Sequence, residues 1–487
     1  MGYLSAIKEQ ESCDETEPSE CERLKLPLAL EMMYNLSSII EDADQVEDLA
    51  TATDLLLRSP ERLDPNEQVV GGYIVGKLTE SLEKLSEKGE RFRDLSPAAT
   101  AIVDTVSTLV EDGVQGDVMP KDESHLLPPR KRKAYKEKLE KEQLEKQEEQ
   151  WKLKKESVSA LMAQVGHIAK ALMTSSAFPE SPNTIGTKAV QLVVHKESKS
   201  ELGEEPVSLP AGKVDLPTDD ALLPFTPSSS DVSWKITGFN DNLYVWDKSA
   251  GDIKSSIVDV TLEDAKGDEI PVNGLSEDIT IVLKNRPEMF QVGHLVNYKH
   301  YGNDTMAFRD FQALGNATYG VTLTVRTAAF IGEVRMYGKL GGDPNDTDHD
   351  FRRLISWGDF DITEYEDVTG YEGKLATFTA YIVLPVGKVN NGNGQYTLGL
   401  LIDECLSQKC KYSVDIVRVG CRYWDSEDNV WKGDGCKVSP KTTREETVCL
   451  CDHLTAFGAD IVRVPTRDPF YSRSAVVQDS SMVCLEE

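Results

Sequence analysis

The sequence lacks any run of about 18 or more apolar residues, so no segment is predicted to span a membrane. Its opening stretch, MGYLSAIKEQESCDE, also lacks the apolar core of a secretory signal peptide. Basic residues are few relative to acidic ones, 53 against 83, and the resulting net charge of −30 argues against nucleic acid as a general partner. Taken literally, these absences describe an acidic cytosolic protein.

The cysteines contradict that simple interpretation, because seven of the nine follow residue 400. Such clustering is typical of disulfide-bonded regions that fold in an oxidising compartment. Glycosylation sequons of the type Asn-X-Ser/Thr would be usable there, and they begin at Asn35, Asn303, Asn316 and Asn345. We therefore interpret the sequence as an incomplete gene product or a piece of a larger membrane protein, on the extracellular side of the membrane.

A helical period dominates residues 25–175, where apolar stripes recur at the spacing of amphipathic helices. Three stripes follow prolines at expected first helical positions, Pro27, Pro65 and Pro97. A fourth stripe closes the region. Short amphipathic helices of this kind are predicted to pack as a small bundle, preceded by a polar, disordered leader at residues 1–24.

Residues 128–155 interrupt the bundle pattern with a charged segment that begins PPRKRK. Opposite charges recur four residues apart, as in Glu137 and Lys141 or Glu142 and Lys146, and such pairs stabilise an exposed helix. We predict a solvated helical insertion between bundle helices. The basic start also matches a nuclear localisation or nucleic-acid patch, but the segment soon becomes charge-balanced, which favours the insertion.

From residue 176 to residue 465 the apolar period changes to two, which is typical of strands. Alternating segments are found at Val190–Val194, Val258–Leu262, Ile279–Leu283, Val321–Val325, Val334–Tyr337, Phe378–Leu384, Tyr396–Ile402 and Tyr412–Val419. Turn signals separate these segments, so we predict an antiparallel β-sandwich. The residues after it, 466–487, are predicted to be a polar tail.

The tripeptide His453-Leu454-Thr455 near the end of the predicted sandwich is a candidate for chemistry. A neutral imidazole is able to take the proton of a nearby hydroxyl, and the Leu454–Thr455 bond lies within reach of that hydroxyl. Attack of Thr455 Oγ on the Leu454 carbonyl carbon would turn the amide into an ester, which water then opens. The chain would cut itself once.

Four cysteines bracket this tripeptide, and two disulfides among them would hold the turn in a fixed, strained conformation. They are Cys421, Cys436, Cys449 and Cys451. As an alternative, Cys449-X-Cys451-X-His453 is a zinc half-site, although structural zinc usually has roughly two to four residues between paired cysteines. As a second alternative, His453 and Thr455 only form a hydrogen-bonded turn beside a disulfide knot.

The same segment resembles the GPS motif, the proteolysis site that closes GAIN domains in adhesion receptors and large polycystins. Its marker positions are matched in order by Cys421, Tyr423-Trp424-Asp425, Trp431, Gly435-Cys436, Cys449-X-Cys451-X-His453-Leu454-Thr455 and Phe457. The resemblance implies that Thr455 is the nucleophile, that His453 is the general base and that the chain is cut after Leu454.

The resemblance also implies the connectivity of the disulfides. The implied pairs are Cys421 with Cys449 and Cys436 with Cys451. Cys405 and Cys410 flank a short polar loop, where some polycystins have a third disulfide, and two free thiols are the alternative. Asp452 stands where the family often has Asn, a difference that bears on how efficiently the bond is cut.

Segments upstream of the motif resemble the region before the GPS motif in polycystins and the receptor for egg jelly. They include Asn242–Trp246, Ile257–Leu262, Gly267–Pro271, Pro344–Thr347 and Tyr396–Leu398. The resemblance covers roughly residues 25–465 apart from the charged segment, and it favours a polycystin over an adhesion receptor. It implies a transmembrane region that is missing from this chain and a channel-forming polycystin partner.

The predicted fold is therefore α+β, with an N-terminal helical bundle followed by an antiparallel β-sandwich that a disulfide-bonded GPS motif at residues 421–465 closes. After cleavage, the strand that begins TAFGADIVRV would stay in the sandwich through ladder hydrogen bonds and apolar burial. The strand is thus the predicted partner of the rest of the chain. We expect no cofactor, no metal, no nucleic acid and no turnover on other substrates.

Two hypotheses of other classes remain open at this point. In the first, the module is a structural or adhesive ectodomain that never cleaves, and Thr455→Ala would then change nothing. In the second, the chain is an intracellular acidic scaffold that uses its charged helix, and all nine cysteines would then react as free thiols.

Overall fold

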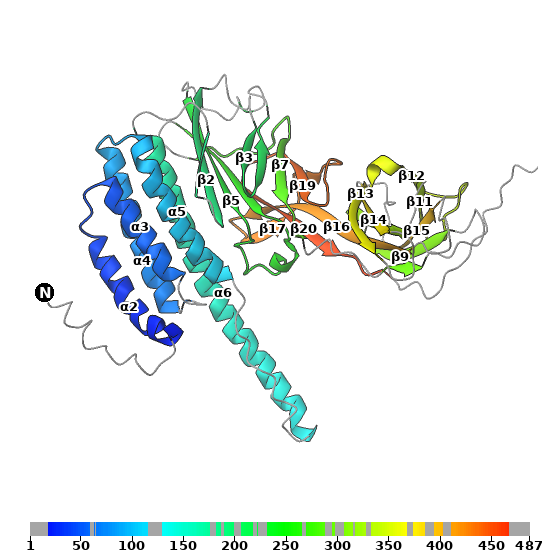
Figure 1. Cartoon of the computed structure of the whole chain (residues 1–487), viewed down its shortest axis with the longest axis horizontal. Coiled ribbons are helices and arrows are strands. Elements are labelled where there is room, and N and C mark those ends of the chain that lie inside the picture. Colours follow the sequence, from blue (N-terminus) through cyan, green and yellow to red (C-terminus); the bar gives the residue numbers. More distant parts are fainter. Residues whose placement is uncertain are drawn as a thin grey trace, which may run out of the picture.

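The computed structural model describes most of the chain between residues 18 and 466, and Figure 1 shows how these parts are arranged. The described residues are 18–58, 63, 65–114, 129–175, 182–186, 189–198, 206–217, 222, 231–264, 269–287, 295–297, 306–314, 317–327, 333–367, 374–384, 394–402 and 411–466. The predicted sites at Asn303, Asn316, Cys405 and Cys410 lie outside these residues, as does most of the predicted leader and tail.

The N-terminal part of the chain is helical. Its helices are α2 (Pro18–Leu36), α3 (Ala43–Leu57), α4 (Pro65–Glu87), α5 (Phe92–Val114) and α6 (Pro129–Thr174). Each turns an apolar stripe to a common core, in which Leu78, Ile102 and Leu172 are fully buried. Helix α3 is capped by Asp42, whose side chain accepts a hydrogen bond from the Gln45 amide.

Two of the three predicted helix starts were wrong, because Pro27 lies inside α2 and Pro97 lies inside α5. Only Pro65 opens its helix. A proline inside a helix loses one backbone hydrogen bond and adds a steric clash, so burial of the apolar stripe must outweigh that cost here. Helix α2 also begins at Pro18, inside the segment predicted to be a disordered leader.

The charged segment is helical as predicted, but it is not a separate insertion. It is the first half of α6, which runs for 46 residues from Pro129 to Thr174 without a break. No proline interrupts the sequence between Arg130 and Thr174, so the helix continues from the charged half into the apolar stripe. Figure 1 shows the charged half extending beyond the other helices of the bundle.

The rest of the described chain forms antiparallel sheets. The longest has the order β1 (Asn183–Ile185), β2 (Val190–Ser198), β5 (Asp231–Phe239), β6 (Ile257–Glu263), β20 (Ala456–Arg463), β16 (Lys411–Asp425), β10 (Thr318–Thr327), β14 (Lys374–Leu384) and β13 (Asp361–Asp367), with β17 (Val430–Lys432) and β8 (Val296–Asn297) also paired to β16. A four-stranded sheet has the order β12 (Phe351–Ile355), β11 (Val334–Leu340), β15 (Gly394–Ile402) and β9 (Ala307–Ala313). A five-stranded sheet has the order β18 (Cys436–Val438), β19 (Glu446–Cys451), β7 (Ile279–Lys284), β4 (Gly212–Asp215) and β3 (Val207–Leu209).

These sheets enclose two separate hydrophobic cores, where the sequence predicted one sandwich. One core lies between the first strands of the long sheet and the five-stranded sheet, and it contains Trp234, Ile281 and Phe457. The other lies between β10, β14 and the four-stranded sheet. Strand β16 joins them, since its residue Ile416 belongs to one core and its residue Cys421 to the other. Figure 1 shows β16 running between the two sandwiches.

The helical bundle packs against the outer face of β2 and β5. Residues Val190, Leu192 and Phe239 belong to the same core as the bundle helices, and the Val190 amide donates a hydrogen bond to Ser107 Oγ at 3.0 Å. The bundle and the outer face of these strands therefore share one core, which is separate from the core inside the first sandwich. Strand β20 contacts both cores at its start, since Ala456 belongs to the core shared with the bundle and Phe457 to the core of the first sandwich.

Candidate functional site

The candidate tripeptide lies between the end of β19 and the start of β20. Backbone hydrogen bonds fix the chain on both sides of the Leu454–Thr455 bond. The Leu454 amide donates to the Val272 carbonyl at 3.1 Å, and the Thr455 carbonyl accepts from the Val260 amide at 3.1 Å. The candidate bond is therefore held in place by the segments that contain Val272 and Val260, and it does not lie on a free loop.

The imidazole of His453 is buried and oriented. Its side chain is 10% exposed, and its Nδ1 lies 3.0 Å from Asp452 Oδ1. The ring packs edge-on against Tyr423, with 4.4 Å between ring centroids, and lies 5.6 Å from the ring of Phe457. Its other nitrogen, Nε2, has no hydrogen-bond partner among the described residues. This leaves Nε2 as the nitrogen that is open to accept a proton.

Gly435 makes room for the His453 and Asp452 side chains. Its φ of +75° lies in the left-handed region, which favours glycine. A Cβ at this position would lie 2.5 Å from Asp452 Oδ1 and 3.0 Å from His453 Nδ1. The Gly435 carbonyl also accepts a hydrogen bond from the Asp452 amide at 3.0 Å. The glycine is thus required both by the backbone and by the close approach of the pair.

Gly435→Ala is expected to reduce cleavage sharply and to lower the free energy of unfolding by about 1–2 kcal/mol, the cost of a left-handed alanine. The new methyl group would displace the Asp452 carboxylate from His453. Gly89→Ala is the matched control, because Gly89 has a φ of +92° with open space around its missing Cβ. Denaturant titration and the cleaved fraction on a denaturing gel measure both effects, and equal cleavage in the two variants would contradict this account.

The hydroxyl of Thr455 is bonded to the backbone and not to His453. It donates to the Trp424 carbonyl at 3.1 Å, whereas the sequence predicted His453 as the base that takes its proton. No hydrogen bond joins His453 to Thr455 in the described residues. The hydroxyl must therefore leave the Trp424 carbonyl before it donates to the base, and that bond, about 1 kcal/mol net, opposes the change.

An aromatic cluster supports the strand segment that holds Thr455. Trp424 and Trp431, both predicted motif positions, lie 5.6 Å apart by ring centroid. Tyr244 stacks on Trp424 at 4.2 Å, and Trp246 meets the same ring edge-on at 5.9 Å. Burial, followed by the charge of Asp259, raises the pKa of Tyr244 far above its usual range, so its ring stays neutral. The cluster belongs to the core that the helices share.

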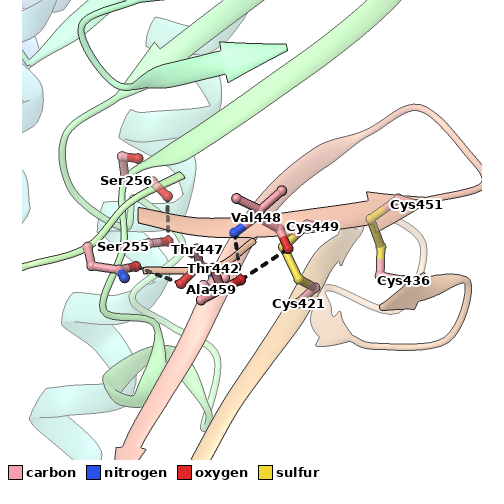
Figure 2. Close-up of a disulfide and its surroundings, with 11 residues drawn as sticks. Ser255, Ser256, Cys421, Cys436, Thr442, Thr447, Val448, Cys449, Cys451 and Ala459 are labelled. Atoms are coloured by element: carbon pink, nitrogen blue, oxygen red, sulfur yellow. Dashed lines mark hydrogen bonds between the residues drawn. A yellow bond between two sulfur atoms is a disulfide. The ribbon is translucent and has the colours of Figure 1, made fainter. Parts of the chain in front are cut away.

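Two disulfides fix the strands around the site, as Figure 2 shows. The structure joins Cys421 to Cys449 and Cys436 to Cys451, the pairs that the resemblance implies. Because the four sulfurs are joined in two disulfides, Cys449 and Cys451 have no free thiolate. They are therefore not available as ligands of the alternative zinc half-site. In the described part of the chain, no cluster of three His, Cys, Asp or Glu side chains is arranged to hold a metal.

Strand β20 is anchored along its length. It pairs with β16 from Phe457 to Arg463, and the Ala459 amide donates to Ser255 Oγ at 2.8 Å (Figure 2). Phe457, a predicted motif position, is fully buried. Asp460, which is 4% exposed, pairs with Arg422 at 3.0 Å and with Arg418 at 3.2 Å, both on β16.

The two described sequons occupy different settings. Asn35 is an exposed residue near the end of α2. Asn345 lies in a loop, where its Oδ1 accepts hydrogen bonds from the Thr347 amide at 2.9 Å and the Asp348 amide at 2.8 Å. Its amide nitrogen is not used in these bonds, so glycosylation at Asn345 stays a prediction that the local geometry permits.

Sequence analysis missed three parts of this site. It connected Asp452 with the efficiency of cleavage but not with His453, and it gave no role to Gly435 beyond its place in the motif or to the Trp424 carbonyl. The direct neighbour of a candidate base is a signal that was available for Asp452. A backbone carbonyl on another strand leaves no signal in the sequence, because any residue at position 424 has one.

Comparison with known proteins gives three findings. The GPS family model, described as GAIN subdomain B, matches residues 404–459. Polycystin-1-like protein 3 of Mus musculus is 27% identical over 325 residues, which cover 63% of this chain and 14% of that protein. Polycystin-1 of Homo sapiens is 33% identical over 91 residues, which cover 16% of this chain and 2% of that protein.

A shorter match reaches an adhesion receptor. Adhesion G-protein coupled receptor G4 of Homo sapiens is 47% identical over 45 residues, which cover 8% of this chain and 1% of that protein. The chain thus spans only a small part of the length of each of these relatives. Among the described helices, none is long and apolar enough to cross a bilayer.

Proposed function

Because this chain contains a polycystin-family region with a GPS motif of the GAIN type, we propose that it is an ectodomain module that cuts its own backbone once, between Leu454 and Thr455. The observation that carries the proposal is the state of His453. Its imidazole is buried, and its Nδ1 contacts Asp452. Its Nε2 has no hydrogen-bond partner in the described residues, and the Thr455 hydroxyl lies two residues further along the chain. A base with an unbonded nitrogen, a hydroxyl two residues further along the chain and a peptide bond held by the backbone are the parts that an acyl shift requires.

The reaction proceeds in two steps. In the first, His453 Nε2 takes the hydroxyl proton of Thr455 while Oγ attacks the Leu454 carbonyl carbon. The C–N bond breaks, the proton passes from Nε2 to the departing Thr455 nitrogen, and an ester joins Leu454 to Thr455 Oγ. In the second, water adds to the ester carbonyl and the C–O bond breaks. The products are a Leu454 carboxylate and a Thr455 with a free amino group and hydroxyl.

The cut chain stays together because β20 remains in the sheet. Its apolar residues Phe457, Ala459 and Ile461 are buried, and burial of each large side chain stabilises the assembly by roughly 1.5–3 kcal/mol. Its ladder with β16 is unaffected by a cut one residue before the strand begins. In a longer membrane protein, this strand would link the ectodomain to the membrane part without a covalent bond.

Asp460→Ala is expected to weaken the retention of the cut strand. The carboxylate is buried and paired with two arginines, and a hydrogen bond to a charged group contributes about 1.5–3 kcal/mol. Urea should therefore release the C-terminal fragment at a lower concentration than in the wild type. Asp348→Ala removes an exposed ion pair with Lys339 elsewhere and is the control. Equal release from both variants would contradict a role for Asp460.

The proposed setting is the extracellular side of a polycystin-like membrane protein. In this proposal, residues 25–175 form the helical subdomain and residues 176–465 the β-subdomain, with the GPS motif at residues 421–465. Glycosylation at the sequons and a channel-forming polycystin partner belong to the same proposal. Its support is the match to polycystins and the disulfide-bonded site.

A second candidate function is a structural or adhesive ectodomain that stays uncut. The observation that favours it is the Thr455 hydroxyl, which donates to the Trp424 carbonyl at 3.1 Å and not to the base. A threonine held in this way stabilises the turn before β20 and needs no chemistry. The two candidates share the fold and differ only in whether the Leu454–Thr455 bond breaks.

Dual tagging separates the two candidates. The full chain, secreted through an added signal sequence, carries an affinity tag at its N-terminus and an epitope tag at its C-terminus. Self-cleavage with retention predicts that the epitope co-purifies with the affinity tag under native conditions and runs as a separate short fragment under denaturing conditions. A single long band that carries both tags would favour the uncut module.

A further inference from the structure

Asp452 selects one tautomer of the candidate base. A carboxylate only accepts hydrogen bonds, so the 3.0 Å contact between Asp452 Oδ1 and His453 Nδ1 places the proton of a neutral ring on Nδ1. The lone pair then lies on Nε2, the nitrogen that has no other partner in the described residues. The opposite tautomer would leave Nε2 protonated and unable to accept the Thr455 proton.

The backbone of Asp452 is fixed by hydrogen bonds at both its amide and its carbonyl. The Asp452 amide donates to the Gly435 carbonyl at 3.0 Å, and the Asp452 carbonyl accepts from the Leu275 amide at 2.8 Å. The missing Cβ of Gly435 leaves the space that Oδ1 occupies. The two backbone bonds hold the main chain from which the Asp452 side chain reaches His453, so only rotation of that side chain would break the contact.

The charge of Asp452 also favours the step in which His453 becomes charged. When Nε2 takes the hydroxyl proton, the ring becomes an imidazolium next to a carboxylate, and a charge-assisted hydrogen bond is stronger than a neutral one. The Asp452 side chain is 42% exposed, so water and salt screen part of this attraction. Tautomer selection is not screened, because it depends on which nitrogen faces the acceptor.

We propose that Asp452 is the positioning residue of the self-cleavage reaction, which holds His453 as the Nδ1-protonated tautomer and stabilises its protonated form. The inference rests on the proposed function. In the part of the chain that the structure describes, no hydrogen bond joins Asp452 to the scissile bond or to the nucleophile, and Asp452 transfers no proton. The acid at this position thus supports cleavage, in contrast to an amide, which is able to turn either its oxygen or its NH2 group toward Nδ1.

The kinetic test compares Asp452→Ala, Asp452→Asn and wild type as full chains. Cell-free translation in the presence of microsomes is stopped, and the cleaved fraction is followed with time. General-base catalysis contributes roughly 10²–10⁴-fold, so Asp452→Ala should slow cleavage about 10- to 100-fold. Asp452→Asn keeps an acceptor oxygen and should lie between the two. Glu427→Ala removes an exposed acid of the β16–β17 turn and should cleave like the wild type.

The outcomes separate this inference from the proposed function. If the wild type cleaves and Asp452→Ala cleaves at the same rate, Asp452 has no positioning role and the proposed function stands. If the wild type stays uncut, the proposed function falls and the role of Asp452 falls with it. If Asp452→Ala and Asp452→Asn slow cleavage equally, the acceptor oxygen is irrelevant and tautomer selection is wrong.

A second measurement covers the case in which Asp452→Ala misfolds. In the uncut Thr455→Ala chain, selective ¹⁵N labelling of histidine reports the protonation of each ring nitrogen, and His453→Gln assigns the signals. The expected result is a protonated Nδ1 and an unprotonated Nε2 at His453, and a loss of this preference when Asp452→Asn is added. An Nε2-protonated ring beside an intact Asp452 would overturn the inference.

Discussion

Replacing Thr455 by alanine is expected to abolish self-cleavage, so that the chain runs as a single polypeptide under reducing, denaturing conditions. The variant lacks the only hydroxyl that lies next to the Leu454 carbonyl in the sequence, and without a nucleophile the acyl shift has no first step. Thr455→Ser retains a hydroxyl and should still cleave. The cleaved fraction on a denaturing gel, compared with wild type, measures the effect.

The alanine variant should nevertheless fold. It loses the hydrogen bond from Thr455 to the Trp424 carbonyl, which contributes only about 1 kcal/mol. Denaturant titration checks this expectation. Cleavage that persists at the same bond in a folded Thr455→Ala chain would contradict the assignment of the nucleophile.

Removing the disulfide between Cys421 and Cys449 is expected to have the largest effect on stability. The two cysteines are 28 residues apart, and the loss of such a cross-link costs about 3–4 kcal/mol in the chain-entropy model. Replacing both by alanine avoids leaving a buried, unpaired thiol. We expect a lower denaturant midpoint together with less cleavage, because β16 and β19 are no longer tied across the site.

Removal of the second disulfide should cost a similar free energy of unfolding, so its effect on cleavage is directly comparable. Cys436 and Cys451 are 15 residues apart, which corresponds to about 3 kcal/mol, and Cys451 directly precedes Asp452. For each kcal/mol of stability lost, removal of the Cys436–Cys451 disulfide should therefore reduce cleavage more than removal of the Cys421–Cys449 disulfide. Unchanged midpoints in both double-alanine variants would show that the cross-links do not hold the folded site.

The local pattern of apolar residues predicted where the strands lie better than it predicted which strands pack together. The alternation of apolar residues located strands such as β7 and β15, because the period depends only on the chain itself. It did not reveal two separate cores, although the alternation in β16 changes phase between Ile416 and Val417, where the strand passes from one core to the other. Which sheet a strand faces is decided by residues hundreds of positions away, as when the Ala459 amide meets Ser255.

In the helical half, too, the local sequence did not predict what tertiary packing decides. Prolines at positions 27 and 97 are good start signals in isolation, but both lie inside helices here. The buried stripe on each helix extends past the proline, so tertiary packing outweighs the local signal. The continuity of α6 is a similar case, since charge composition marked a boundary where the backbone has none.

The candidate site was predicted in its residues but not in its contacts. The motif named His453, Thr455 and the cysteines, and the structure joins the cysteines in the implied pairs. The hydrogen bond that holds His453 comes from its own neighbour, and the bond that holds Thr455 comes from strand β16. Spacing alone does not show that the Thr455 hydroxyl donates to the Trp424 carbonyl and not to the base.

The most direct test of the account is the intact mass of the secreted full chain under reducing, denaturing conditions. Self-cleavage at the proposed bond predicts two masses, one for a fragment that ends at Leu454 and one for a fragment that begins at Thr455 with a free amino group. Under native conditions the two should elute together. A single uncut mass in a sample whose four motif cysteines are all disulfide-bonded would contradict the account and identify the module as a folded, uncut ectodomain.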